Sequence, residues 1–147
     1  MLSLEPSGGS QSKNAITEQL LNLIGTTKEQ LNVVTPKIDR FFTVELQKLA
    51  KKGVPILLVT SDRHLIPKTY QEFYDALKST QGISLINNPN VRFLLVFNSE
   101  KAIYAGGALD KEDLEKSVLI ITMLKEQAKL RKIAEIFTLM LPTFMRK

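Results

Sequence analysis

The residues best suited to chemistry in this sequence are charged side chains in two loops, each directly after an apolar run. They are Lys37 after the run LNVVTP, and Asp62, Arg63, His64 and Lys68 after the run VPILLVT. Open α/β sheets bind ligands at the carboxyl ends of their strands, so these loops are expected to lie together at one sheet edge. Arg63 is suited to bidentate contact with an anion. The pattern therefore predicts an anion site, and the alternative is an ordinary surface loop in which Asp62 pairs with Arg63 or a backbone amide.

The same loop raises a second possibility, a hydrolase that uses Asp62 and His64 as an acid/base pair. No serine or other nucleophile is identifiably coupled to that pair. The chain has no cysteine and a single histidine. These counts exclude disulfides, thiolate catalysis, multi-histidine metal sites and any mechanism that needs two imidazoles.

The acidic stretch DKEDLEKS offers Asp110, Glu112, Asp113 and Glu115 as oxygen ligands for a metal. Interspersed lysines favour a solvated helical turn instead, so no metal or other cofactor is predicted. The net charge of +5 favours an anionic partner, although the basic residues are scattered along the chain. Few aromatics and no clustered arginines predict no stacking platform for single-stranded nucleic acid.

These residues must be positioned by alternating helices and strands. Helical spacing of apolar residues predicts helices within 14–30, 37–53, 67–82 and 124–144. Apolar runs predict strands within 31–36, 54–60, 83–89, 90–97 and 101–107, while 117–123 fits either a strand or a helix start. The alternation in the first half predicts right-handed crossovers and parallel strands, and the turn at Asn98–Glu100 predicts a hairpin.

The length fits one domain, predicted to span residues 14–147 after a flexible lead-in over residues 1–13. The lead-in is rich in proline, glycine and serine and lacks the pattern of a secretory signal. No run of 18 apolar residues occurs, so we expect no membrane span and a cytoplasmic location.

The C-terminal helix has almost no polar face over its last part, which predicts burial on more than one side. The expected interface residues are Ile136, Phe137, Leu139, Met140 and Phe144. A second copy of the chain or a larger complex would cover them. The alternative is that the helix lies deep in its own domain.

Three stretches together resemble one unit of the phospholipase D-like fold. They are LNVVTPKI, LQKLAKKGVPILLVTS and NVRFLLVFNSEKAIYAGG, and the resemblance extends over roughly residues 14–144. It implies an α/β domain with a mixed, mostly parallel sheet flanked by helices. The chain is similar also to the effector domains of archaeal sugar-responsive transcription regulators.

The resemblance also implies where catalytic residues would lie. The family signature is His-x-Lys, four residues and then Asp, followed by a glycine pair and an Asn. In this chain the His position falls on Asn90, the Lys on Arg92, the Asp on Phe97 and the later Asn near Leu109. An amide is no useful nucleophile or proton shuttle, whereas Arg92 could still hold a phosphate.

The sequence thus predicts a catalytically inactive phospholipase D-like module for binding or assembly. We expect a homodimer or a subunit of a complex, with DNA, RNA or a phosphorylated ligand bound along the basic edge formed by Lys37, Arg63, His64, Lys68 and Arg92. The ligand-sensing part of a transcription regulator is the alternative that the second resemblance raises.

Overall fold

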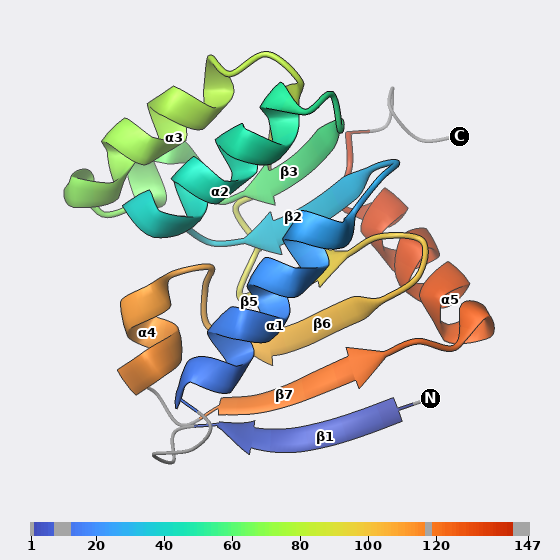
Figure 1. Cartoon of the computed structure of the whole chain (residues 1–147). Helices are drawn as coiled ribbons and strands as arrows, with labels where there is room; N and C mark the ends of the chain where they lie inside the picture. Colours follow the sequence, from blue (N-terminus) through green and yellow to red (C-terminus); the bar gives the residue numbers. More distant parts are fainter. Residues whose placement is uncertain (1, 8–12, 117–118, 143–147) are drawn as a thin grey trace.

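A computed structural model describes residues 2–7, 13–116 and 119–142 of the chain. Its centre is one seven-stranded sheet with the order β1-β7-β6-β5-β2-β3-β4 (Figure 1). The strands are β1 (Leu2–Ser7), β2 (Leu31–Thr35), β3 (Ile56–Thr60), β4 (Ile83–Asn87), β5 (Phe93–Phe97), β6 (Ala102–Gly106) and β7 (Leu119–Leu124). The α/β architecture and the mixed sheet are therefore confirmed.

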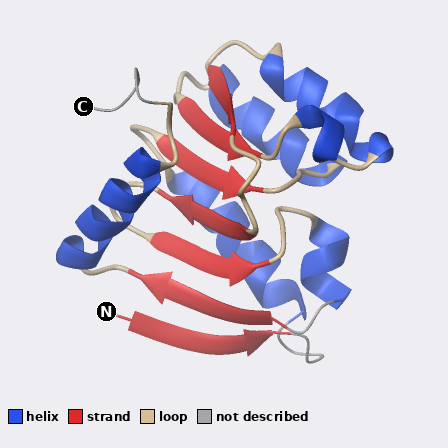
Figure 2. Ribbon diagram, turned by 180° about the vertical axis from the view of Figure 1, so that it is seen from behind, coloured by secondary structure: helices blue, strands red, loops and turns tan. Residues whose placement is uncertain are grey.

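Four of the five α-helices cover one face of the sheet, and the fifth covers part of the other face (Figure 2). The first four are α1 (Lys13–Thr26), α2 (Arg40–Lys51), α3 (Gln71–Lys78) and α4 (Lys111–Lys116). The fifth is α5 (Gln127–Leu139), and two short 3-10 turns, η1 (Arg63–Leu65) and η2 (Lys68–Tyr70), precede α3.

Each face of the sheet has its own apolar core, because alternate residues of a strand point to opposite faces. In β5, Leu94 and Val96 belong to the core beneath α1 to α4. Leu95 and Phe97 belong to the core beneath α5. All four side chains are at least 95% buried, so β5 is a central strand enclosed on both sides.

The parallel part of the sheet is smaller than the sequence predicted. Among the described strands, parallel pairing joins only β2, β3 and β4, and all pairings that involve β5, β6, β7 or β1 are antiparallel. The β5–β6 hairpin that the sequence predicted is present, and Asn98 closes its tight turn by accepting the backbone N–H groups of Glu100 and Lys101 at 2.8 and 2.9 Å. A turn of this length can join only antiparallel strands.

The prediction of a flexible lead-in is wrong for the first residues of that segment. Leu2–Ser7 forms the edge strand β1, paired antiparallel with β7 from Leu2↔Leu124 to Ser7↔Leu119. A strand partner distant in sequence supplies the backbone hydrogen bonds that a Pro- and Ser-containing segment cannot provide by itself. Helix α1 begins at Lys13, close to the predicted start of the domain.

Within the described part of the chain, none of the helices combines the length and apolar character needed to cross a membrane.

Candidate functional site at the carboxyl edge of the sheet

The loops after β2 and β6 meet at the carboxyl edge of the sheet, because β2 and β6 run in the same direction on either side of β5. Ile38 and Leu109 form an isolated parallel bridge. The Asp39 N–H donates to the Leu109 carbonyl at 3.2 Å, and the Leu109 N–H donates to Thr35 Oγ1 at 2.9 Å. Gly107, with φ of +93°, makes the turn that brings the second loop back to the first.

Two carboxylates at this junction cap helices. Asp39 accepts the Phe42 N–H at the start of α2 at 2.9 Å and the Lys111 N–H of α4 at 2.8 Å. Asp110 accepts the Asp113 N–H at the start of α4 at 3.1 Å. Burial raises the pKa of Asp39 above its usual value, and the Asp110 charge adds to this while the two amides oppose it. Both carboxylates therefore have structural partners already, which fixes the loops in place.

Asp110, only 1% exposed, also joins Lys37 and Tyr70. The Tyr70 hydroxyl donates a short hydrogen bond to Asp110 Oδ2, and this bond is the main reason that the pKa of Tyr70 is raised. Lys37 Nζ lies 3.8 Å from Asp110, 3.2 Å from Asp113 and 4.3 Å from the centre of the Tyr70 ring. Burial lowers the pKa of Lys37, but the hydrogen bond that it donates to Asp113 and the surrounding charges raise the pKa overall.

Arg63 makes the bidentate contact that its chemistry predicted, but with a carboxylate of the same chain. Its Nε and Nη2 donate to Asp75 Oδ1 and Oδ2, both at 2.8 Å. This hydrogen bond raises the pKa of Arg63 and lowers that of Asp75. Arg63 therefore pairs with a residue of α3, twelve positions along the chain, rather than with Asp62.

The other predicted cations do not converge on a pocket. His64 and Lys68 lie exposed in η1 and η2. Arg92 is exposed, and its Nη1 donates to the backbone carbonyls of Pro89 and Val91 at 2.8 and 3.1 Å. Among the described residues, the side chains of Asp62 and His64 form no hydrogen bond or ion pair with each other, so an acid/base pair receives no support.

Tyr70, Lys37 and Ile66 close the space beneath this edge. The cavity that they share with Thr60 and Tyr74 has a volume of about 10 Å³. A single water needs about that much room, so a phosphate group does not fit without movement of the η1–η2 segment.

The residues that the resemblance assigns to the signature positions have structural contacts of their own. Asn90 is exposed, and its N–H donates to Asn88 Oδ1 at 2.9 Å in a turn before β5. Phe97 is 4% exposed and packs edge-on against Phe137 of α5, with ring centres 5.2 Å apart. Leu109, near the position of the later Asn, is fully buried.

Only some of the residues predicted to form an interface on α5 are exposed. Ile136 and Leu139 are 51% and 67% exposed, while Met140 is partly buried. Phe137 is a correction, because it contributes to the core against Phe97 instead of facing a partner. Phe144 lies outside the described residues.

An entirely apolar pocket of about 220 Å³ lies between α5 and strands β5 to β7. Its lining residues are Phe93, Leu95, Tyr104, Leu124, Ile133 and Ile136. Tyr104 is 44% exposed, and its ring centre is 5.5 Å from that of Phe93. Sequence reasoning missed this aromatic pair, because Phe93 and Tyr104 meet only through the β5–β6 pairing.

The sequence also did not single out Asp39 or Tyr70. A usable signal existed for Asp39, which stands just before a helical apolar pattern, as N-cap residues do. Asp110 was considered only as a metal ligand. No group of three or more possible metal-binding side chains occurs among the described residues. Tyr70 carried no signal, since its partner Asp110 is 40 residues away.

Comparison with solved structures identifies the fold. NucT from Helicobacter pylori superposes with a TM-score of 0.78 at 9% identity, covering 95% of this chain and 96% of that chain. Nuc from Salmonella typhimurium, a phospholipase D family member, superposes with a TM-score of 0.78 at 13% identity, covering 95% of this chain and 94% of that chain. The archaeal chromatin protein TrmBL2, described as having a novel mode of DNA binding, superposes with a TM-score of 0.63 at 11% identity. The match covers 92% of this chain and 50% of that chain.

The chain therefore has a phospholipase D-like fold, as the sequence resemblance implied. The scan of protein-family models and the search of curated proteins returned no match.

Proposed function

We propose that this protein is a non-catalytic phospholipase D-like module for binding or assembly. The observation that supports the proposal is the buried aromatic ring of Phe97, at the position that the resemblance assigns to the family carboxylate. An amide at Asn90 in the place of the nucleophilic imidazole supports the same conclusion. The carboxylates of Asp110 and Asp113 hold Lys37, one of the cations that would otherwise contact a phosphate.

The catalytic part of the proposal is tested with the variant Asn90→His/Arg92→Lys, which restores the His-x-Lys pair. Both positions are exposed, so we expect the free energy of unfolding to change by less than about 0.5 kcal/mol. Hydrolysis of bis(p-nitrophenyl) phosphate should stay at the buffer rate for both the variant and the wild type. Measurable turnover by the wild type, retained after gel filtration, would falsify the proposed absence of catalysis.

The assembly part rests on the α5 surface, defined here as Tyr104, Ile133, Ile136 and Leu139. Three of these side chains are large apolar groups with 44–67% exposure, and the adjoining pocket has no polar lining. Pockets of this kind at a surface are commonly filled by another chain. The ion pairs Lys129–Glu126 and Lys132–Glu135 place both positive and negative charges along α5. Charges of both signs suit the self-complementary surface of a two-fold dimer.

We expect Ile136→Glu to convert an assembled form into a monomer, because it places a charge beside the apolar pocket. Light scattering after size-exclusion chromatography measures the mass directly. Leu65→Glu is the matched control, since Leu65 is 54% exposed on η1, outside this surface, and should leave the mass unchanged. A wild-type protein that is monomeric throughout the accessible concentration range contradicts assembly through this surface.

An anionic partner such as DNA or RNA is the second part of the binding proposal. The support is the net charge of +5 and the exposure of His64, Lys68 and Arg92 along one edge. Running the same chromatography with duplex and single-stranded DNA tests it, with Lys68→Ala/Arg92→Ala as the variant. Equal retention with and without nucleic acid would count against this partner.

The ligand-sensing part of a transcription regulator is a second candidate. It is favoured by one observation, the similarity of this chain to half of the TrmBL2 chain. A sensor of this type should show a higher melting temperature with its small ligand. A panel of sugars that leaves the melting temperature unchanged removes the sugar-sensing version.

A further inference from the structure

The two edge strands of the sheet differ in how their sequences guard against pairing with a further strand. Strands β1 and β4 stand at the two ends of the strand order. Proteins commonly protect such edges with charges, prolines or bulges. Strand β1 contains Glu5 and Pro6. Strand β4, with the sequence ISLIN, contains neither a charge nor a proline, and its register with β3 is continuous from Ile56↔Ile83 to Thr60↔Asn87.

Hydrogen bonds to β3 determine which backbone groups of β4 point inward. The Ile56 N–H donates to the Gly82 carbonyl at 2.9 Å, and the Asn88 N–H donates to the Thr60 carbonyl at 2.8 Å. Because successive residues of a strand alternate in direction, the backbone groups of the even-numbered residues of β4 face β3. The residues whose backbone groups face the open edge of the sheet are Ile83, Leu85 and Asn87.

Most of these edge-facing groups have no partner within residues 2–7, 13–116 and 119–142. The Ile83 N–H is used in the turn before β4, where it donates to the Thr80 carbonyl at 3.2 Å. The groups without a partner are the Ile83 carbonyl and both the N–H and the carbonyl of Leu85 and Asn87. Another extended strand carries donors and acceptors at the same spacing, so it is the kind of partner that this edge fits.

We propose that β4 pairs antiparallel with β4 of a second copy of this chain, with Leu85 on the two-fold axis. In this register the Leu85 N–H donates to the Leu85 carbonyl of the second copy, and the reverse bond forms by symmetry. The Asn87 N–H donates to the Ile83 carbonyl of the second copy. These bonds use donors and acceptors that one chain leaves without partners, so the edge is complementary to itself.

The side chains of β4 favour the same occupant. Leu85 is half-buried against the core beneath α1 to α4, and Ile86 is half-buried against the core beneath α5. Pairing places Leu85 opposite its own copy and Ile86 opposite Ser84, which covers apolar surface on both faces of the sheet. No charged residue occurs from Gly82 to Asn88, so the two strands meet without like-charge repulsion.

This contact is separate from the α5 surface, because β3, β2 and β5 lie between β4 and the strands β6 and β7. The inference is therefore independent of the assembly proposed above. One pair of short strands is a small interface, so we expect it to form at the high protein concentrations of NMR and to dissociate at those of chromatography.

Amide hydrogen exchange of the whole chain, measured by NMR at two protein concentrations, tests this pairing. The Leu85 N–H should exchange with water roughly twofold or more slowly at about 1 mM protein than at about 0.05 mM, because pairing shields it. The Ile86 N–H is the internal reference, since it faces β3 and should exchange slowly at both concentrations. An exchange rate of the Leu85 N–H that is the same at both concentrations overturns the proposal.

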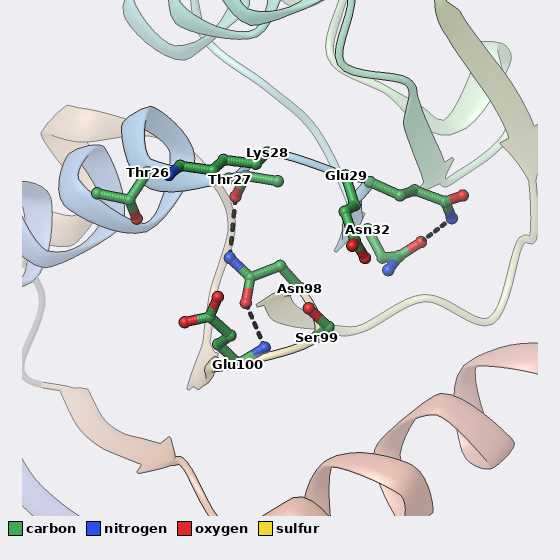
Figure 3. A pocket seen from close by; sticks show the side chains of 9 residues that line it. Thr26, Thr27, Lys28, Glu29, Asn32, Asn98, Ser99 and Glu100 are labelled. Atoms are coloured by element: carbon green, nitrogen blue, oxygen red, sulfur yellow. Dashed lines mark hydrogen bonds between the residues drawn. The ribbon is translucent and has the colours of Figure 1, made fainter.

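A charge placed on the edge locates the contact. Ser84→Lys should abolish the concentration dependence, because Ser84 is exposed and the two introduced lysines would be diagonal neighbours across the axis. Ser99→Lys is the matched control, since Ser99 is an exposed serine of the β5–β6 turn, away from β4 (Figure 3). Ser99→Lys and Ile136→Glu should both exchange as the wild type does. The proposal fails if Ser84→Lys keeps the concentration dependence, or if Ile136→Glu removes it.

Discussion

We expect Phe97→Asp, which introduces a carboxylate at the position that the resemblance assigns to the signature aspartate, to destabilise the protein by about 4 kcal/mol or more. Removal of a buried phenyl ring alone costs about 3–5 kcal/mol. The new carboxylate would in addition be buried beside Phe137, among the apolar side chains of the core beneath α5. Urea denaturation followed by circular dichroism measures the loss.

Phe97→Leu is the matched control for this substitution. It keeps an apolar group of similar size in the core, so the loss should be about 1 kcal/mol. If Phe97→Asp unfolded at the same urea concentration as Phe97→Leu, the ring would not have the buried position beside Phe137 described here.

The second large effect is expected for Asp110→Ala, with a loss of about 3 kcal/mol in the free energy of unfolding. The substitution removes the cap of α4, leaves the Tyr70 hydroxyl without its acceptor and takes one of two carboxylates from Lys37. A cap contributes about 1 kcal/mol, and the loss of a buried acceptor adds about 1–3 kcal/mol.

Asp113→Ala is the matched control, because Asp113 also pairs with Lys37 but its side chain is 46% exposed. The Asp113→Ala substitution should lower the free energy of unfolding by less than about 1 kcal/mol. A double-mutant cycle with Asp110→Asn and Tyr70→Phe should then give a coupling energy of about 0.5–3 kcal/mol. Equal losses for the two alanine variants would mean that burial of Asp110 has no energetic consequence.

The two anion-site arginines illustrate how far local chemistry could be predicted. The type of contact was right for Arg63, since it is bidentate to a carboxylate, but the partner is Asp75 of α3. Arg92 is satisfied by carbonyls only one and three positions away. The residue type determines what a guanidinium binds, whereas the folded neighbourhood determines whether an internal acceptor reaches it first.

The C-terminal helix illustrates the same limit for packing. The apolar sequence of α5 predicted burial on several sides, and it placed Ile136, Phe137 and Leu139 together. The structure separates them, with Phe137 at 4% and Leu139 at 67% exposure. Helical periodicity gives the angular spacing of these side chains but not which angle faces the sheet, and that was decided by the position of Phe97 on β5.

The sequence by itself determined the α/β class and most of the strands and helices, because apolar periodicity is a local property. Only the tertiary structure decided that Leu2–Ser7 completes the sheet, that Asp110 meets Tyr70 and Lys37, and that Phe93 packs against the exposed Tyr104. Each of these depends on strand pairing or loop contact between residues distant in sequence. Such contacts form only when the whole chain is folded, so no single segment encodes them.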